Sequence, residues 1–289
     1  MALKQKFQRA LAFPPVRFAA DVAGIYFTKQ VGRSAAQLAY FLTLTFFPVL
    51  ICVSAFVSKL NLNMTSLLEE LQHLLPEGVF IIFRDYLGYL DSNLSTPMLI
   101  AGVSLAVFSA SAAIRGLMSI MQEIYGRSNF TGLRQIVASV IFSVLLLVTI
   151  YLSLAVVVTG NWFFHLLGNL LGLADLVERF GAWQWIKYLL LLAIVFLFIL
   201  LLYRFAAPLK KPRPPVVPGA LLSAVALVVA SLLFSLIMSR STRYSLVYGS
   251  LASLIILLLW LYLCSNIFIL GNVVNCVLER RRAEKHTNS

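Results

Sequence analysis

The feature that most constrains this chain is a run of thirty-five residues without a charged side chain, from Tyr244 to Leu278. As a helix, this run would be about 50 Å long at 1.5 Å per residue. The hydrocarbon core of a bilayer is about 30 Å thick, so the run is long enough to cross it. Its later half carries the amides of Asn266, Asn272 and Asn275, and an unmet polar group is costly in hydrocarbon. We therefore expect a membrane-spanning helix with one side facing protein.

The composition of the chain agrees with a membrane protein. Hydrophobic residues make up 61% of the 289 residues and charged residues only 12%, which is about half the charged share of a soluble domain. The formal net charge is nevertheless +12. Because the basic residues fall mainly between apolar runs, we attribute them to membrane topology and to contact with anionic lipid headgroups. We expect the lipid bilayer as partner and no nucleic acid.

Five further apolar runs accompany the last one. They predict an all-α polytopic membrane protein with six transmembrane helices and short interfacial amphipathic helices. The expected spans are about 34–58, 92–123, 136–159, 183–204, 214–239 and 246–272, within a membrane domain at 34–278. Residues 1–33 are read as a basic interfacial segment and 279–289 as a solvated tail. Two amphipathic helices are expected on the far surface within 61–91, and Gly160-Asn161 is expected to break the third helix.

The distribution of basic residues predicts the orientation of the chain. With the N-terminus inside, the inner segments hold sixteen Lys and Arg residues and the outer segments hold six. Cytoplasmic loops carry the excess of positive charge, so we expect both termini in the cytoplasm. No removable signal peptide is expected. The three cysteines, Cys52, Cys264 and Cys276, show no paired spacing, which argues against a disulfide or a metal site.

Arg115 is the charge that most suggests a function, because it lies inside an otherwise apolar helix. It could face a substrate, or it could reach the headgroups or pair with Glu123, and the sequence leaves both readings open. Polar residues that could line a cavity are Gln37, Tyr40, Asn266 and Asn275, although hydrogen bonding between helices is the simpler explanation for each. Residues expected to shape the helices are Pro48, which should kink the first span, and the small residues Gly116, Gly249 and Gly271.

Signals for an enzyme are poor. The three histidines, His73, His165 and His286, have no second histidine at metal-ligand spacing. The sequence contains no glycine-rich phosphate loop and no nucleophile elbow. We expect no enzymatic activity, no metal and no cofactor.

Several segments together are typical of one family. They are AAQLAYFLTLTFFPVL (Ala35–Leu50), SASAAIRGLMSIMQEIYG (Ser109–Gly126), LYRFAAP (Leu202–Pro208), PGA (Pro218–Ala220) and YGSLASLIILLLWLYLCSNIFILGNVVNCVLE (Tyr248–Glu279). In order and spacing the chain resembles the YihY/BrkB membrane proteins, formerly labelled ribonuclease BN. The family often has Gly-Ala-Glu-Leu-Asn near the end of the last span, where this chain has Val273 in place of the glutamate. Any proton or cation role of that glutamate does not carry over.

The resemblance implies a six-helix protein of the bacterial inner membrane without a settled activity. Among possible roles, a transporter or lipid flippase of unknown substrate is favoured, and a non-transporting scaffold or envelope-assembly factor is the alternative. Ribonuclease activity finds no support in the residues. A transporter predicts a polar cavity enclosed by spans one, two, five and six, whereas a scaffold predicts a packed bundle. The sequence leaves the substrate, the coupling ion and the oligomeric state open.

Overall fold

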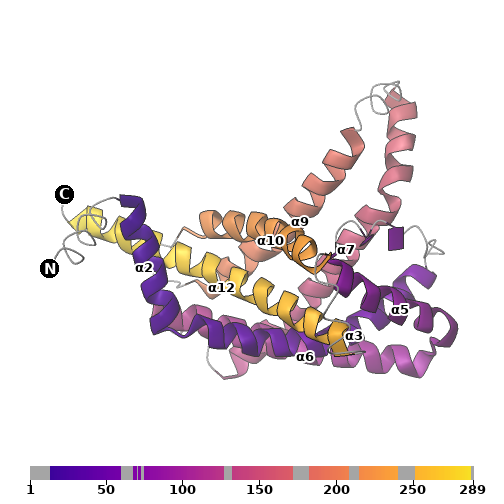
Figure 1. Ribbon diagram of the computed structural model, residues 1–289, viewed down its shortest axis with the longest axis horizontal. Coiled ribbons are helices and arrows are strands. Elements are labelled where there is room, and N and C mark those ends of the chain that lie inside the picture. The colour runs from indigo at the N-terminus through magenta and orange to yellow at the C-terminus, as the bar shows by residue number, and fades with distance from the viewer. Residues whose placement is uncertain are drawn as a thin grey trace.

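The computed structural model describes residues 14–59, 68–69, 71–72, 75–126, 132–171, 182–207, 215–239 and 251–287. These ranges hold eight long helices and no strand, which confirms the predicted all-α class. The helices are α2 (Pro14–Thr28), α3 (Val31–Lys59), α5 (Glu77–Asn93), α6 (Thr96–Tyr125), α7 (Leu133–Leu171), α9 (Ala182–Ala206), α10 (Val217–Ser239) and α12 (Ala252–Thr287). Figure 1 shows α2 and the end of α12 together at one end of the molecule and α5 at the other. These ends are called the α2 end and the α5 end below.

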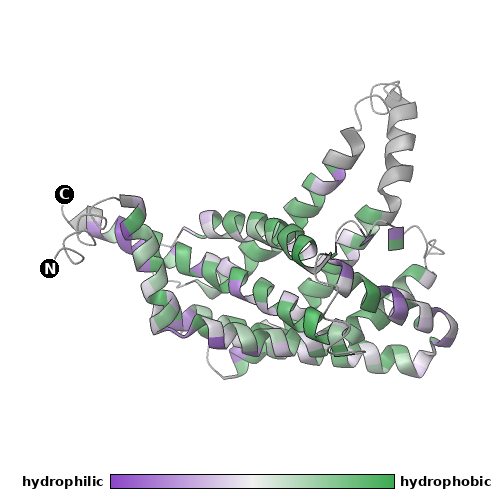
Figure 2. Cartoon of the chain, viewed as in Figure 1, coloured by the Kyte–Doolittle hydropathy of each residue, from purple (hydrophilic) through white to green (hydrophobic). Residues whose placement is uncertain are grey.

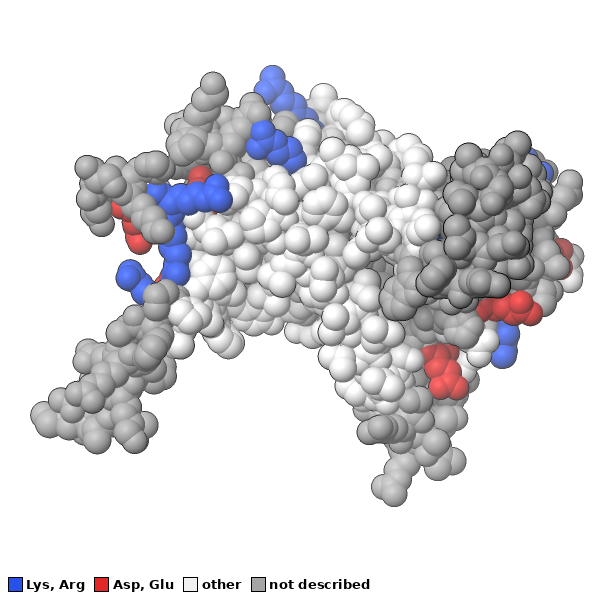
Figure 3. Space-filling model, turned by 90° about the horizontal axis from the view of Figure 1, so that it is seen from above, with Lys and Arg blue, Asp and Glu red and all other residues white. Residues whose placement is uncertain are grey.

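Six of the described helices are long and apolar enough to cross a membrane, as predicted. They are α3, α6, α9, α10 and most of α7 and α12. Figure 2 shows that apolar residues dominate their middle parts, whereas polar residues gather toward the α2 and α5 ends. On the face seen in Figure 3, charged side chains likewise lie toward the two ends, with a wide uncharged belt between them. This belt is what a bilayer would cover. The cytoplasmic location of the α2 end stays a prediction.

The six apolar helices form a closed ring of neighbours. Each of α3, α6, α7, α9, α10 and α12 packs against the next in that order, and α12 closes the ring on α3 (Figure 1). In addition, α6 touches α12 and α9 across the ring. The residues of α6 explain its central place, because Ala106, Ala110 and Ala113 are fully buried and small side chains let helices approach closely. Its end is set by Gly126, which adopts a left-handed backbone conformation with φ of 68°.

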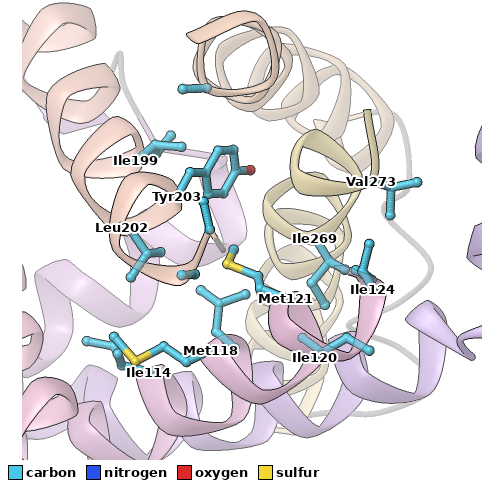
Figure 4. Close-up of a cluster of buried hydrophobic side chains, with 14 of the residues drawn as sticks. Ile114, Met118, Ile120, Met121, Ile124, Ile199, Leu202, Tyr203, Ile269 and Val273 are labelled. Atoms are coloured by element: carbon cyan, nitrogen blue, oxygen red, sulfur yellow. The ribbon is translucent and has the colours of Figure 1, made fainter. Parts of the chain in front are cut away.

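The main apolar core lies in the half of the bundle toward the α2 end. It takes residues from all six apolar helices, and Figure 4 shows Met118 and Met121 of α6 beside Tyr203 of α9 and Ile269 of α12. A second core at the α5 end joins α3, α5 and the middle of α7. The helix α5 packs against α3 and α12: Phe83 and Leu87 are buried, and Ile256 occupies the space above Gly78.

Some predicted features differ in the structure. The predicted break at Gly160-Asn161 is wrong, because α7 continues as one helix to Leu171. Glycine and asparagine inside a helix cost only about 1 kcal/mol or less each, which a long apolar helix tolerates. The last helix also runs past the predicted end of its span, to Thr287. Its residue Arg281 is held by Asp21 of α2 at 2.7 Å, so the expected solvated tail is helical and packed there.

The predicted N-terminal helix is present as α2, but its apolar face packs on the bundle. Phe18, Val22 and Tyr26 lie against the main core, and α2 contacts α12 and α3. The chain turns sharply into α3 at Gln30, whose φ of 49° is left-handed. The first of the two helices expected within 61–91 falls largely outside the described residues, whereas α5 is the second.

Candidate functional site: buried polar groups where α6, α9, α10 and α12 meet

The helices α10 and α12 cross with almost no space between their backbones. A Cβ atom added at Gly271 would lie 2.7 Å from the carbonyl oxygen of Gly219 and 2.6 Å from the hydroxyl of Tyr203. A Cβ at Gly219 would in turn overlap the carbonyl oxygen of Gly271. Only glycine fits at either position, because a methyl group would force the two helices apart. The crossing fixes the distance at which neighbouring polar side chains can reach across.

Asn275 uses this short distance to cap α10. Its Oδ1 accepts a hydrogen bond of 2.7 Å from the backbone amide of Gly219, and its Nδ2 donates one of 3.2 Å to the carbonyl of Val216. The first amides of a helix have no partner within that helix. Asn275 is fully buried, so its amide satisfies a backbone donor that water cannot reach. This gives a structural reason for an amide in the last apolar helix.

Tyr203 of α9 joins the same junction. Its hydroxyl lies 2.8 Å from the Oγ of Ser223 and donates to the carbonyl of Phe268. The Oγ of Ser223 is also 3.2 Å from the carbonyl of Ile267. Figure 4 shows the ring of Tyr203 beside the apolar cluster, with its hydroxyl directed toward α12. These bonds tie α9, α10 and α12 together at one level of the bundle.

Three other residues at this end have buried polar atoms without a hydrogen-bond partner, and we call them the orphan cluster. They are Gln122 and Tyr125 of α6 and Asn272 of α12: among the described residues, nothing bonds to the Gln122 Nε2, the Tyr125 hydroxyl or either amide atom of Asn272. A buried unsatisfied group costs about 1–3 kcal/mol. Several such groups together favour a place that water or a polar ligand enters.

The members of the orphan cluster lie close to one another along the bundle. The thiol of Cys276 is 3.6 Å from the carbonyl of Ile124, and Tyr125 lies within electrostatic range of Cys276 and of Tyr203. Asn272 is one helical turn before Cys276, and Gln122 is one turn before Tyr125. The cluster therefore sits where α6, α9 and α12 meet, beside the Tyr203 junction.

Arg115 lies between α6 and α7, apart from the Tyr203 junction. Its guanidinium donates to the Oγ of Ser111 at 3.1 Å and to the Oγ of Ser139 at 3.3 Å. One turn further along α6, the Oγ of Ser119 accepts a hydrogen bond of 2.8 Å from the Nε2 of Gln135. No carboxylate of the described chain forms an ion pair with Arg115. Its positive charge is thus held by neutral hydroxyls and stays available to an anion.

Four polar residues of α6 lie on one side of the helix, and we call them the α6 stripe, although the fully buried, apolar Met118 lies between Arg115 and Gln122 on that side. Ser111, Arg115, Gln122 and Tyr125 are spaced by four, seven and three residues, which places them on one side of a helix. From Ser111 to Tyr125 the stripe covers about 21 Å at 1.5 Å per residue. This is about two thirds of a hydrocarbon core. Arg115 and the α6 members of the orphan cluster therefore lie along the same side of α6, two helical turns apart.

The remaining predicted residues lie in different places. Gln37 and Tyr40 are exposed on the outer side of α3, away from the junction. Asn266 accepts a hydrogen bond of 3.0 Å from the Tyr26 hydroxyl of α2. Burial, and then the neighbouring Tyr262, raises the pKa of Tyr26, which keeps it protonated as a donor. Of the positions expected to shape the helices, Pro48 is buried within α3, which continues through it. Gly116 has open space beside it. Gly249 lies outside the described residues.

Sequence reasoning did not propose Tyr203, Ser223, Gln122 or Tyr125 as site residues. Tyr203 and Tyr125 both stand in segments that were quoted for the family resemblance. A buried tyrosine needs a hydrogen-bond partner, so a tyrosine near the end of an apolar helix was an available signal. The spacing of Ser111, Arg115 and Gln122 was also visible, but it acquires meaning only when the neighbours of α6 are known.

Comparison with known proteins identifies the family. The model of the family described as "Virulence factor BrkB" matches residues 24–289. The chain belongs to the BrkB family. A relative from Bacillus subtilis (strain 168), named "Putative ribonuclease-like protein YfkH", is 28% identical over 259 residues, which covers 89% of this chain and 93% of that protein. No solved structure matches the chain. The family explains why the segments that resemble it occur in this order, and the Tyr203 junction contains residues from three of them.

Proposed function

We propose that this BrkB-family protein is a transporter or lipid flippase of the bacterial inner membrane, and that it is not an enzyme. The observation that carries the proposal is the orphan cluster, in which buried amide and hydroxyl groups lack partners inside an apolar bundle. A membrane protein that served only as a packed scaffold would gain stability by replacing these groups with apolar side chains. Their presence is accounted for if a polar substrate or water occupies the region during the transport cycle.

The α6 stripe supports an anionic group as the part of the substrate that is handled. Arg115 offers a positive charge to which only hydroxyl groups are bonded, and a charge within the apolar part of a membrane is a default candidate for function. An anionic headgroup entering between α6 and α7 would meet Arg115 first. It would then pass toward Gln122 and Tyr125, whose free hydrogen-bonding groups can replace those of water.

A non-transporting scaffold is the second candidate. The close crossing at Gly219 and Gly271 favours it, because three helices are locked together there by short contacts and hydrogen bonds. Such a rigid junction is equally useful as the fixed part of a transporter. The two candidates differ in whether water reaches the α6 stripe.

We propose no ribonuclease activity, although the Bacillus subtilis relative carries a ribonuclease-like name. Metal-dependent cleavage of RNA needs several metal-ligating side chains close together. Within the described part of the chain, no group of three or more His, Cys, Asp or Glu side chains comes together. Incubating the purified protein with labelled RNA and divalent cations tests this point, and cleavage that copurifies with the protein would contradict it.

Cysteine accessibility tests whether the α6 stripe is wet. The native Cys52, Cys264 and Cys276 are first replaced, and single cysteines are placed at Ser111 and Gln122. Control cysteines replace Leu105 and Phe108, which are 53% and 69% exposed on the outer side of α6 and would face lipid. A membrane-impermeant thiol reagent should label the stripe positions and spare the controls. Labelling of neither stripe position, from either side of the membrane, would favour the scaffold.

Transport itself is tested in proteoliposomes with fluorescent phosphatidylglycerol and phosphatidylethanolamine, whose loss of signal to a membrane-impermeant quencher reports movement between leaflets. The variant Arg115→Gln should lower the rate for the anionic lipid at least tenfold. The matched control is Arg84→Gln, which removes an exposed arginine that pairs with Asp85 at the α5 end. Equal rates for Arg115→Gln and the wild type would remove Arg115 from the mechanism.

A further inference from the structure

A cavity of about 450 Å³ lies between α2 and the last turns of α12. It is separate from the orphan cluster and sits at the α2 end of the bundle. Its lining residues are Arg17, Ala20, Asp21, Gly24, Ile25, Thr28, Lys29, Val277, Arg280, Arg281 and Glu284. The last uncharged stretch of the chain ends at Leu278. The cavity therefore lies at the level where hydrocarbon gives way to lipid headgroups.

The charges around this cavity leave a positive excess. Four basic residues face two carboxylates. Asp21 is occupied by Arg281 at 2.7 Å, and the guanidinium of Arg281 also lies 5.1 Å from the centre of the Phe18 ring. Arg17 and Arg280 form no ion pair with any carboxylate of the described residues. Lys29 pairs with Glu123 at 3.6 Å, and Arg280 also lies within hydrogen-bonding range of the Cys276 thiol. With Glu284 as the second lining carboxylate, Arg17 and Arg280 leave a net excess of one positive charge for an external anion.

Part of the cavity lining is apolar. Ala20, Gly24 and Ile25 of α2 and Val277 of α12 supply it. A cavity lined by both guanidinium groups and apolar side chains matches a phosphate joined to a glycerol backbone and acyl chains. A free phosphate ion would make no use of the apolar side chains.

We propose that this cavity binds the headgroup of an anionic phospholipid, with the guanidinium groups of Arg17 and Arg280 on the phosphate oxygens. The bound lipid would join α2 to α12 beside the pair formed by Asp21 and Arg281. The site goes beyond the proposed function, because binding here requires no movement of lipid across the membrane. A failure of the transport assay would therefore leave this proposal standing.

Native mass spectrometry of the full chain in detergent, titrated with phosphatidylglycerol or phosphatidylcholine, tests the charge requirement. The double variant Arg17→Gln/Arg280→Gln should weaken phosphatidylglycerol binding about tenfold or more, since each basic side chain near anionic lipid contributes roughly a fivefold factor. The control Arg282→Gln removes an exposed neighbouring charge outside the lining and should bind as the wild type. Equal binding of the two lipids by the wild type, or no loss in the double variant, overturns the proposal.

A steric variant tests the position without changing charge. A Cβ at Gly24 would meet nothing within 4 Å, so Gly24→Leu can fill the cavity without disturbing the helix. Gly88 of α5 has the same open space, and Gly88→Leu is the matched control. We expect Gly24→Leu alone to lose phosphatidylglycerol binding, and wild-type binding by this variant would contradict the site. Inorganic phosphate at millimolar concentration should not displace the lipid, and full displacement would assign the cavity to soluble phosphate instead.

Discussion

Replacing Gly271 by alanine should destabilise the protein, although alanine is the better helix former. The new methyl group would overlap the Oγ of Ser223 and lie 2.6 Å from the Tyr203 hydroxyl and 2.7 Å from the Gly219 carbonyl oxygen. These distances are at least about 0.7 Å shorter than ordinary van der Waals contact, which begins at 3.4 Å. Tyr203 is fully buried and the carbonyl belongs to the backbone, so α10 and α12 must separate. Overpacking of this kind costs about 1–3 kcal/mol. The hydrogen bonds at the crossing would also lengthen, at about 1 kcal/mol each.

Helix propensity opposes this loss by about 1 kcal/mol, so we expect a net destabilisation of about 2–4 kcal/mol for Gly271→Ala. The matched control is Gly116→Ala, because Gly116 lies inside α6 with no atom within 4 Å of an added Cβ. That variant should be more stable than the wild type by about 0.5–1 kcal/mol. Reversible unfolding in mixed micelles with increasing sodium dodecyl sulfate, followed by tryptophan fluorescence, measures both. A neutral or stabilising Gly271→Ala would refute the close crossing.

Three further predictions concern other contacts. Asn275→Ala should cost about 2–4 kcal/mol, because it leaves the buried Gly219 amide unsatisfied, whereas Asn266→Ala should cost about 1 kcal/mol in the same unfolding assay. In Gly102→Ala, the new methyl group should clash with Ile51, whose Cγ2 would be 2.8 Å away. Adding Ile51→Ala should relieve the clash, so the double variant should lose at least about 1 kcal/mol less unfolding free energy than the sum of the two single losses. Because the pKa of Tyr26 is raised by burial, wild-type stability should be complete below the ordinary tyrosine pKa of about 10 and fall as the pH rises above it. Tyr26→Phe should show a smaller fall, because Tyr86 and other groups with raised pKa values remain, and a fall of the same size in both proteins would contradict the prediction.

The Tyr203 junction and the orphan cluster differ in whether their polar groups have hydrogen-bond partners within the protein. At the junction, Asn275 and Tyr203 have their hydrogen-bonding groups paired with backbone atoms of α10 and α12. In the orphan cluster, only a short distance away along α6 and α12, the polar atoms are buried without partners. A polar network in which every group is hydrogen-bonded makes the bundle rigid. Buried polar groups without partners need water or a polar ligand to bond with them. This contrast is why we propose that the junction is a fixed part of the bundle and that the orphan cluster lies on the path of a transported group.

The membrane character and the number of spans could be predicted from the sequence with little more than length and charge. A run such as 244–278 has no charged residue and exceeds the bilayer thickness, so a soluble fold was excluded before any contact was known. The end of α6 near Gly126 was also readable, because glycine acts on the local backbone, whereas α6 begins at Thr96, four residues after the predicted start of the span at 92. Local signals failed at Gly160-Asn161, where a long apolar helix outweighed two weak helix formers.

The pairing of polar residues was not readable in the same way. Asn275 was proposed for a cavity wall, and the structure places it as the cap of α10, because its partner Gly219 is fifty-six residues away in the chain. Gly219 and Gly271 determine which residues meet, yet each glycine acquires its role only when the other helix lies against it. The sequence by itself determined that the chain crosses the membrane six times, because burial in lipid depends on each segment alone. Only the tertiary structure decided which polar groups are satisfied and which are left open, because hydrogen bonding between helices depends on distances that no single segment contains.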